Sequence, residues 1–362
     1  MKIALNAWFQ DMPHTGSGQY ARQLEAALRE IAPHVDIAAV RPRARDNASK
    51  VWFEQVGFPR AADRMRADVA LTPYWAPPLH SRTPAVVTVH DVIPLALPDY
   101  RGGPLQRAYT SLVRAASANA AHIITDSEFS RKDILKHLPV RPESVSAIPL
   151  AADARFTPFV PAEQMQAVRE RYNLPDSYVL YLSNFDRRKN IETLMQVYVW
   201  CGEPIGHDFP LVIAGEPDTP VFAHNGRKMT LAQMAKELEV DDVVHFIGRV
   251  AEEDKPAVYA GARCFLFTSL YEGFGLPALE ALACGVPVVG SNAASIPEVV
   301  GDAGMLVDPM DARRMAGAVI AVCTEDVLHD QLSRRALLQA AKFSWQRTAF
   351  ETLAVLKSVV RS

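Results

Sequence analysis

Short apolar runs alternate with stretches of helical periodicity along most of the chain. Between the first two runs, Tyr20, Leu24, Leu28 and Ile31 recur at the spacing of one helical face. Strands that alternate with helices predict a parallel sheet covered on both faces, and right-handed crossovers make such a domain doubly wound and Rossmann-like. In the first half the predicted strands are residues 2–7, 35–40, 69–73, 85–90, 122–126 and 145–150, and the predicted helices are 18–32, 105–121 and 127–138.

The alternation stops after residue 150 and resumes near residue 177. Residues 151–165 carry two prolines and little periodicity, which indicates a linker. The pattern therefore predicts two α/β domains of the same class, 1–165 and 166–343, followed by an amphipathic helix over 344–360 that Ser344 caps. In the second domain the predicted strands are 177–184, 210–216, 243–248, 264–269, 286–291 and 304–309, and the predicted helices are 231–240 and 255–262.

The composition narrows the class of protein. The chain is 49% hydrophobic and 22% charged, which is typical of a soluble globular protein, and it contains no apolar run of about 18 residues. A net charge of −3 argues against nucleic acid as a partner. The slight basic excess of residues 1–170 either indicates an anionic partner, such as a membrane surface, or has no meaning.

The four cysteines are scattered and lack zinc-site spacing: Cys201, Cys264, Cys284 and Cys323. We expect reduced thiols in a cytoplasmic protein. The N-terminal apolar stretch ends at Gln10 and Asp11, which predicts a first strand and not a signal peptide.

Loops that follow strands carry the candidate chemistry, because open α/β sheets bind ligands beyond the carboxyl ends of their strands. After the first strand, Gly16, Gly18 and Ala21 match GxGxxA, but the acidic residue of a dinucleotide site is missing, since Asp36 lies at the beginning of the second strand. This loop either contacts an anionic ligand at the start of the helix or is only a turn that caps it.

Polar residues also end two further strands. His90 and Asp91 follow the fourth strand and either face a ligand or hydrogen-bond each other. Arg187, Arg188 and Lys189 precede a helix that starts near residue 190, and three cations there oppose the helix dipole unless an anion lies between them. We expect this anion to be a diphosphate; the alternative is that the long side chains point into water.

The sequence YEGFGLPALEALACGVPVV (271–289) combines two carboxylates with a Gly-Phe-Gly turn. Pro277 fits position N1 of a helix, with Gly285 after its end. Glu280 lies about one turn into that helix, so Glu272 and Glu280 are expected to frame one pocket from two sides. Carboxylates accept hydrogen bonds from vicinal hydroxyls, which sugars and riboses carry.

This motif resembles the signature of family 4 (group 1) glycosyltransferases, which are retaining enzymes of GT-B fold, and mannosyltransferases look most similar. TGSGQY, IPLAAD, RRKN, VIAGE and VVHFIGRV precede the motif in the expected order, and FSWQRTAFETL closes the chain. The resemblance implies two Rossmann-like domains facing a cleft, an acceptor-side domain 1–165 and a nucleotide-sugar domain 166–343. It also implies that residues 344–362 return to the first domain.

The resemblance also implies roles for individual residues. Glu280 holds the donor ribose, and Glu272, with the backbone of Gly273, Phe274, Gly275 and Leu276, holds the donor sugar. Lys189 neutralises the donor diphosphate, which Gly16 or Gly18 approaches from the other domain. His90 lies near the C6 side of the sugar or near the reacting centre, and Arg249 and Val250 border the base.

One position departs from the family pattern. Many members carry an arginine five residues before the lysine as a second phosphate ligand, where this chain has Asn184. Either Arg187 or Arg188 substitutes for it, or the leaving diphosphate is held more weakly. Because Lys189 does what a metal does elsewhere and no Asp-x-Asp motif is present, we predict no metal and no cofactor.

The predicted function is transfer of a hexose, with mannose favoured, from a GDP- or UDP-linked donor to a glycan or lipid-linked acceptor, with retention. A nucleotide-sugar binding protein, or an epimerase or phosphorylase of the same fold, is the alternative. The expected location is the cytoplasm, with peripheral contact between the N-terminal domain and the inner face of the membrane as a further possibility. The sequence leaves the oligomeric state open.

Overall fold

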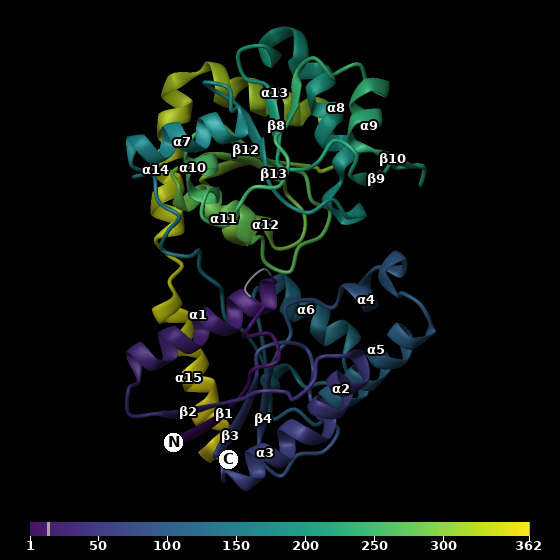
Figure 1. Cartoon of the computed structure of the whole chain (residues 1–362), viewed down its shortest axis with the longest axis vertical. Coiled ribbons are helices and arrows are strands. Elements are labelled where there is room, and N and C mark those ends of the chain that lie inside the picture. Colours follow the sequence, from purple (N-terminus) through teal and green to yellow (C-terminus); the bar gives the residue numbers. More distant parts are fainter. Residues whose placement is uncertain (13–14, 362) are drawn as a thin grey trace. The chain divides into compact units, whose positions relative to one another are not determined.

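A computed structural model describes residues 1–12 and 15–361, and the chain divides into two compact units (Figure 1). Unit 1 comprises Met1–Leu150 and Phe343–Ser362, and unit 2 comprises Ala151–Lys342. The sequence-based division differs in that it placed residues 151–165 in the first domain. Among the described residues, no helix combines the length and apolar character needed to cross a membrane.

Unit 1 is built on a six-stranded parallel sheet, and all six predicted strands of this half are present. The strand order reverses between β1 and β3, which makes this pair the switch point of a doubly wound sheet. In spatial order the strands are β2 (Asp36–Val40), β1 (Lys2–Asn6), β3 (Val69–Thr72), β4 (Ala85–Thr88), β5 (His122–Thr125) and β6 (Val145–Ala147).

The helices of unit 1 include the three predicted ones and a helical stretch over residues 47–64 that the sequence analysis missed. In that stretch, a π-helical turn, Phe53–Gly57, joins two short helices. The α-helices are α1 (Gly16–Ile31), α2 (Asn47–Trp52), α3 (Phe58–Arg64), α4 (Ile93–Ala96), α5 (Pro104–Ser117), α6 (Glu128–His137) and α15 (Trp345–Arg361).

The C-terminal helix α15 belongs to unit 1 and packs against α1 (Figure 1). Ser344 caps it as predicted, since its hydroxyl accepts a hydrogen bond from the Arg347 amide at 3.2 Å. The predicted apolar stripe is buried at Ala349, Leu353 and Leu356, whereas Val360 is 40% exposed. The return of this segment to the first unit is therefore confirmed.

Unit 2 has a second six-stranded parallel sheet, and again all six predicted strands are present. The strand order, which reverses between β7 and β12, is that of a Rossmann sheet. A short antiparallel hairpin, β9 (Pro220–Phe222) and β10 (Lys228–Thr230), was not predicted. The main strands are β11 (Val244–Phe246), β8 (Leu211–Ile213), β7 (Val179–Tyr181), β12 (Cys264–Phe267), β13 (Val288–Ser291) and β14 (Gly304–Val307).

Helices cover both faces of this sheet. Alternate residues of β7 enter different cores: Val179 and Tyr181 pack under one layer of helices, and Leu180 packs under the other. The four cysteines are buried and none is in a disulfide. The helices are α7 (Ala162–Tyr172), α8 (Ile191–Cys201), α9 (Leu231–Glu237), α10 (Lys255–Ala260), α11 (Leu276–Ala283), α12 (Ile296–Val300), α13 (Ala312–Thr324) and α14 (Asp326–Ala340).

Candidate functional site

The loops after β7 and β12 lie side by side because these strands are neighbours at the switch point of unit 2. Val179 pairs with Cys264 and Leu180 with Phe265, in parallel register. The carboxyl ends of both strands therefore point to the same edge of the sheet, where doubly wound folds bind their ligands.

Buried hydrogen bonds hold the two loops together. The Thr268 hydroxyl donates to the Lys189 carbonyl at 2.9 Å, and the Leu270 amide donates to the Arg188 carbonyl at 2.7 Å. Asn190 adopts a left-handed conformation with φ 58°, and its side-chain amide donates to the carbonyls of Thr268 and Pro309 at 3.2 and 2.7 Å. These bonds fix the backbone from which the predicted cations project.

The Gly-Phe-Gly turn is fixed in a similar way. The Ser295 hydroxyl is fully buried and donates to the carbonyl oxygens of Glu272 and Phe274, at 2.9 and 2.8 Å. Gly275 has φ 112°, a conformation that side-chain-bearing residues rarely adopt, and α11 begins at the next residue, Leu276. The sequence predicted Pro277 as the first residue of the helix, but it is the second. Gly285 follows the helix with φ 75°.

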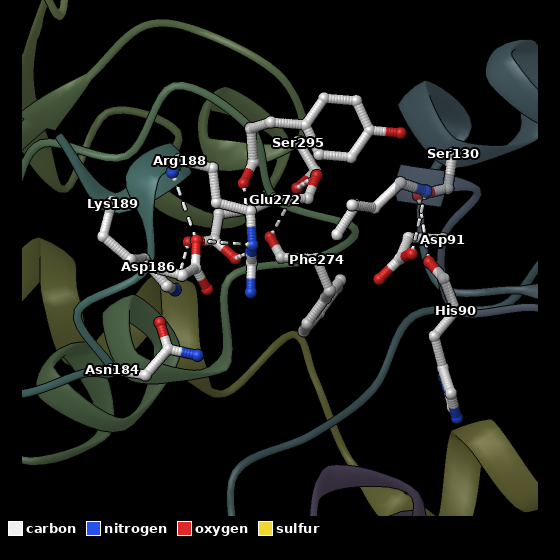
Figure 2. A network of polar contacts seen from close by, with 12 residues as sticks. His90, Asp91, Ser130, Asn184, Asp186, Arg188, Lys189, Glu272, Phe274 and Ser295 are labelled. Carbon is white, nitrogen blue, oxygen red and sulfur yellow. Dashed lines mark hydrogen bonds and ion pairs between the residues drawn. The ribbon is translucent and has the colours of Figure 1, made fainter. Parts of the chain in front are cut away.

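A compact charge cluster lies at the junction of these loops (Figure 2). The Glu272 carboxylate contacts Lys189 Nζ at 2.5 Å through one oxygen and Arg188 Nη1 at 2.9 Å through the other. Arg188 also pairs with Asp186 at 3.2 Å and donates to the Tyr271 carbonyl at 3.1 Å. The side chains of Lys189, Glu272 and Arg188 are only 4%, 8% and 15% exposed.

Burial and pairing act in opposite directions within this cluster. Burial alone raises the pKa of Glu272, but the attraction of Lys189 and Arg188 outweighs it and holds that pKa below its usual value. The pKa of Lys189 is lowered, mainly by burial and further by Arg188, against the attraction of Glu272. Glu272 is therefore ionised and supplies a negative charge between the predicted cations.

The three predicted cations do not behave alike. Lys189 and Arg188 share one carboxylate, whereas Arg187 is exposed and lies over the Phe222 ring at 5.3 Å. Asn184 is exposed as well, and its carbonyl accepts a hydrogen bond from the Tyr181 hydroxyl at 2.7 Å. Of the two arginines considered as substitutes at Asn184, Arg188 is thus the one beside Lys189.

Glu280 has a different environment from Glu272. It is partly buried on α11, and burial raises its pKa to about 7 despite the opposing effects of Lys255 and the Tyr259 hydroxyl. Lys255 also contacts Glu252, which pairs with Arg155 at 3.0 Å. The two glutamates of the motif therefore have separate sets of charged neighbours.

The remaining predicted residues of unit 2 lie either after β11 or in the turn before α11. Arg249 is exposed, whereas Val250 is 6% exposed and packs in the hydrophobic core, so its side chain has a structural role. Phe274 is buried and Gly273 partly buried. In the part of the chain that the structure describes, no three or more His, Cys, Asp or Glu side chains are grouped to hold a metal ion.

The glycines of unit 1 differ in their surroundings. A Cβ on Gly18 would lie 2.1 Å from the Met12 carbonyl oxygen and 2.7 Å from that of Phe9, so close packing of its own loop requires glycine there. Among the described residues, a Cβ on Gly16 would meet no atom within 4 Å. Thr15 caps α1 by accepting from the Gly18 amide at 3.1 Å. The two glycines thus differ, and the described part of the loop requires glycine at position 18 but not at position 16.

His90 is held inside unit 1. Its Nδ1 lies 2.8 Å from an Asp126 carboxylate oxygen, Nε2 is buried, and the Tyr20 ring packs edge-on at 4.8 Å. Burial lowers the pKa of His90, but Asp126 and Asp91 outweigh this effect and raise it. Asp91 accepts from the Ile93 amide at 3.0 Å. The proposed contact of His90 with a sugar stays a prediction.

Several residues of these sites were not singled out from the sequence. Asp126 directly follows β5, so the rule that polar residues at strand ends mark a site could have found it. Asn190 and Ser295 act through backbone contacts with residues distant in sequence, and no local pattern reveals them. Asp186 instead caps the turn that follows it, since its carboxylate accepts from the Arg188 amide at 3.1 Å.

Two family models match the chain: Glycosyltransferase Family 4 over residues 16–156, and Glycosyl transferases group 1 over residues 164–339. O-antigen chain mannosyltransferase B of Escherichia coli is 33% identical, covering 77% of this chain and 71% of that protein. MMP alpha-(1->4)-mannosyltransferase of Mycolicibacterium hassiacum is 30% identical, covering 76% and 66%. The match to the E. coli serotype-specific mannosyltransferase WbdA, at 31% identity, covers 73% of this chain but 32% of that protein.

Solved structures share the fold at lower identity. Sucrose-phosphate synthase from Thermosynechococcus elongatus aligns with TM-score 0.73 at 22% identity, over 99% of both chains. Anabaena HepE in complex with UDP-glucose aligns with TM-score 0.73 at 18% identity, over 99% of this chain and 100% of that one. Both sheets of this chain thus follow the GT-B glycosyltransferase architecture.

The raised pKa of Glu280 predicts a pH-dependent cost to stability. Between pH 4.5 and 7 the unfolded state has lost a proton that the folded state retains, so the free energy of unfolding falls as pH rises through this window. Glu280→Gln removes the cost. We expect the variant to be more stable than the parent by about 3 kcal/mol above pH 7 and similar to it at about pH 4, below the unfolded pKa.

Urea unfolding of both proteins without ligand, from about pH 4 to about pH 8, measures this difference. Two stability curves that stay parallel across the range would contradict the assignment.

Proposed function

The chain belongs to the group 1 glycosyltransferases of family 4, and we propose that it transfers mannose from GDP-mannose to a hydroxyl of a polysaccharide or lipid-linked acceptor. Anomeric configuration is retained in the proposed reaction. The observation that carries the proposal is the pair of cations at the switch point of unit 2, the buried Lys189 and the partly buried Arg188. The choice of mannose is supported by curated relatives named as mannosyltransferases at 30–33% identity.

The proposed chemistry follows from charge. Breaking the bond between the sugar C1 and the phosphate oxygen leaves a positive ring and a negative diphosphate. Lys189 and Arg188 stabilise that negative charge, and the amino-terminal end of α11 adds a partial positive charge. The acceptor oxygen bonds to C1 on the face that the diphosphate leaves, and its proton passes to the departing phosphate.

The two glutamates position the donor in this proposal. Glu272 accepts hydrogen bonds from the mannose hydroxyls, and Glu280 accepts them from the ribose hydroxyls. His90, which Asp126 anchors, is proposed to contact the sugar. Since Lys189 and Arg188 supply the positive charge, the proposed reaction uses no metal and no cofactor.

Product analysis tests the function directly. We expect GDP release from GDP-mannose only when a mannan-type oligosaccharide or lipid-linked acceptor is present, and an α-linked product from the α-linked donor, measured by NMR coupling at the new anomeric carbon. UDP-glucose serves as the control donor. If UDP were released from UDP-glucose and no GDP from GDP-mannose, the choice of donor would be wrong. If the protein bound a donor but released no nucleotide from either, it would be a binding protein and not an enzyme.

Replacement of Lys189 tests the electrostatic role. We expect Lys189→Ala to lower kcat by about 10²- to 10³-fold, because one charged contact to the developing negative charge is lost. Lys189→Arg should retain part of the rate if charge is what matters. Lys236→Ala, at an exposed lysine of α9 in the same unit, is the matched control and should keep full activity.

Thermal unfolding establishes that each lysine variant is folded. Parental turnover by folded Lys189→Ala would rule out the proposed role of this residue.

Chelation tests the proposed independence from metal. We expect transfer to continue at an unchanged rate after dialysis against EDTA, since the cations of the site are covalently part of the chain. A loss of activity that Mg²⁺ or Mn²⁺ restores would refute this part of the proposal.

A further inference from the structure

The phosphate-binding cations proposed above are already neutralised by the protein itself. Lys189 and Arg188 carry two positive charges, and Glu272 and Asp186 carry two negative charges against them (Figure 2). One carboxylate, that of Glu272, spans both cations, one oxygen to each. This is the arrangement that a phosphate group makes with a lysine and an arginine.

Access to Lys189 depends on this carboxylate. The lysine side chain is 4% exposed, and Glu272 is the one hydrogen-bond acceptor of its Nζ among the described residues. The face of the Phe267 ring lies 5.3 Å from the ammonium group and offers no acceptor for a hydrogen bond. A phosphate oxygen therefore reaches Nζ by taking the place of a Glu272 oxygen.

The backbone of Glu272 is fixed, so the exchange is confined to its side chain. Ser295 holds the carbonyls of Glu272 and Phe274, and Gly275 sets the turn that follows. The Arg188 and Lys189 carbonyls are tied to Leu270 and Thr268. An exchange of ligand for carboxylate at the cations would therefore move the Glu272 side chain and leave both loop backbones in place.

We propose that Glu272 stands in for the donor diphosphate when no donor is bound and that its displacement makes the enzyme prefer an intact nucleotide sugar over a nucleoside diphosphate. The inference rests on the proposed function. When the donor binds, its diphosphate takes over Lys189 and Arg188, and its sugar hydroxyls become the new partners of Glu272.

A nucleoside diphosphate alone cannot complete this exchange. It takes the cations but brings no hydroxyls for Glu272, which is left as a buried carboxylate without its partners, at a substantial cost in free energy. The same situation arises after transfer, when the hexose has left with the acceptor. Glu272 then competes for Lys189 and Arg188 and promotes release of the product.

Glu272→Gln tests the proposal, because glutamine keeps the size of the side chain and removes the charge. We expect calorimetric titration with GDP to show binding at least about tenfold tighter than to the parent protein, as when a competing buried charge is removed. Binding of GDP-mannose should gain less, so the preference for the sugar nucleotide shrinks.

Glu237→Gln is the matched control. It removes the same charge from the same unit but from an exposed glutamate of α9 that pairs with Arg227, not Lys189. We expect this variant to bind GDP no more tightly than the parent. Equal tightening in both variants would show a general effect of net charge and overturn the inference.

A second measurement uses the parent protein alone, in case the glutamine variant does not fold. Free mannose at tens of millimolar supplies the missing hydroxyls, so we expect it to strengthen GDP binding to the parent. Parent protein that binds GDP without any response to mannose would overturn the inference. If the parent binds neither GDP nor UDP, the proposed function itself is wrong.

Discussion

The site depends on one electrostatic constraint, the pairing of Glu272 with Lys189 and Arg188. Three nearly buried charges cannot be left apart, because a charge removed from water costs several kcal/mol unless it is paired. The loops that carry them come from strands separated by more than eighty residues in sequence but adjacent in the sheet. The buried polar contacts of Asn190, Thr268 and Ser295 therefore hold the backbone in place, so that the charges meet at contact distance.

The strands of both units could be predicted because parallel strands are buried on both faces and read as continuous apolar runs. The hairpin of β9 and β10 has no such run, since Lys228 and Phe222 face solvent, and its pairing rests on a turn at Gly226 with φ 84°. The helical stretch over 47–64 was missed for a related reason. Its π-helical turn shifts the helical phase, so that its buried side chains do not recur at one period.

The site could be predicted only as far as local motifs reach. Lys189 and Glu272 stand out because each lies in a loop after an apolar run. Lys189 belongs to a group of cations before a helix, where they oppose the helix dipole, and Glu272 directly precedes the Gly-Phe-Gly turn. Which arginine joins Lys189 could not be predicted, because it depends on the side chain that approaches from the loop after β12. The partner of His90 was hidden for the same reason, since Asp126 comes from a neighbouring strand end. At Gly18 the sequence suggested a ligand contact, but the close packing of its own loop is enough to require glycine there.

Two identical side chains eight residues apart have opposite electrostatic surroundings, and this difference is what the fold contributes to the chemistry. Glu272 is kept ionised by the cations that it contacts, whereas burial raises the pKa of Glu280 to about 7. Environments that separate the pKa values of two carboxyl groups give them different tasks. In the proposed exchange Glu272 competes with the donor diphosphate for Lys189 and Arg188, whereas Glu280 has Lys255 as its cationic neighbour. The donor in this proposal brings both an anionic group for the cations and hydroxyls for the carboxylates, and a nucleotide sugar carries both in one molecule.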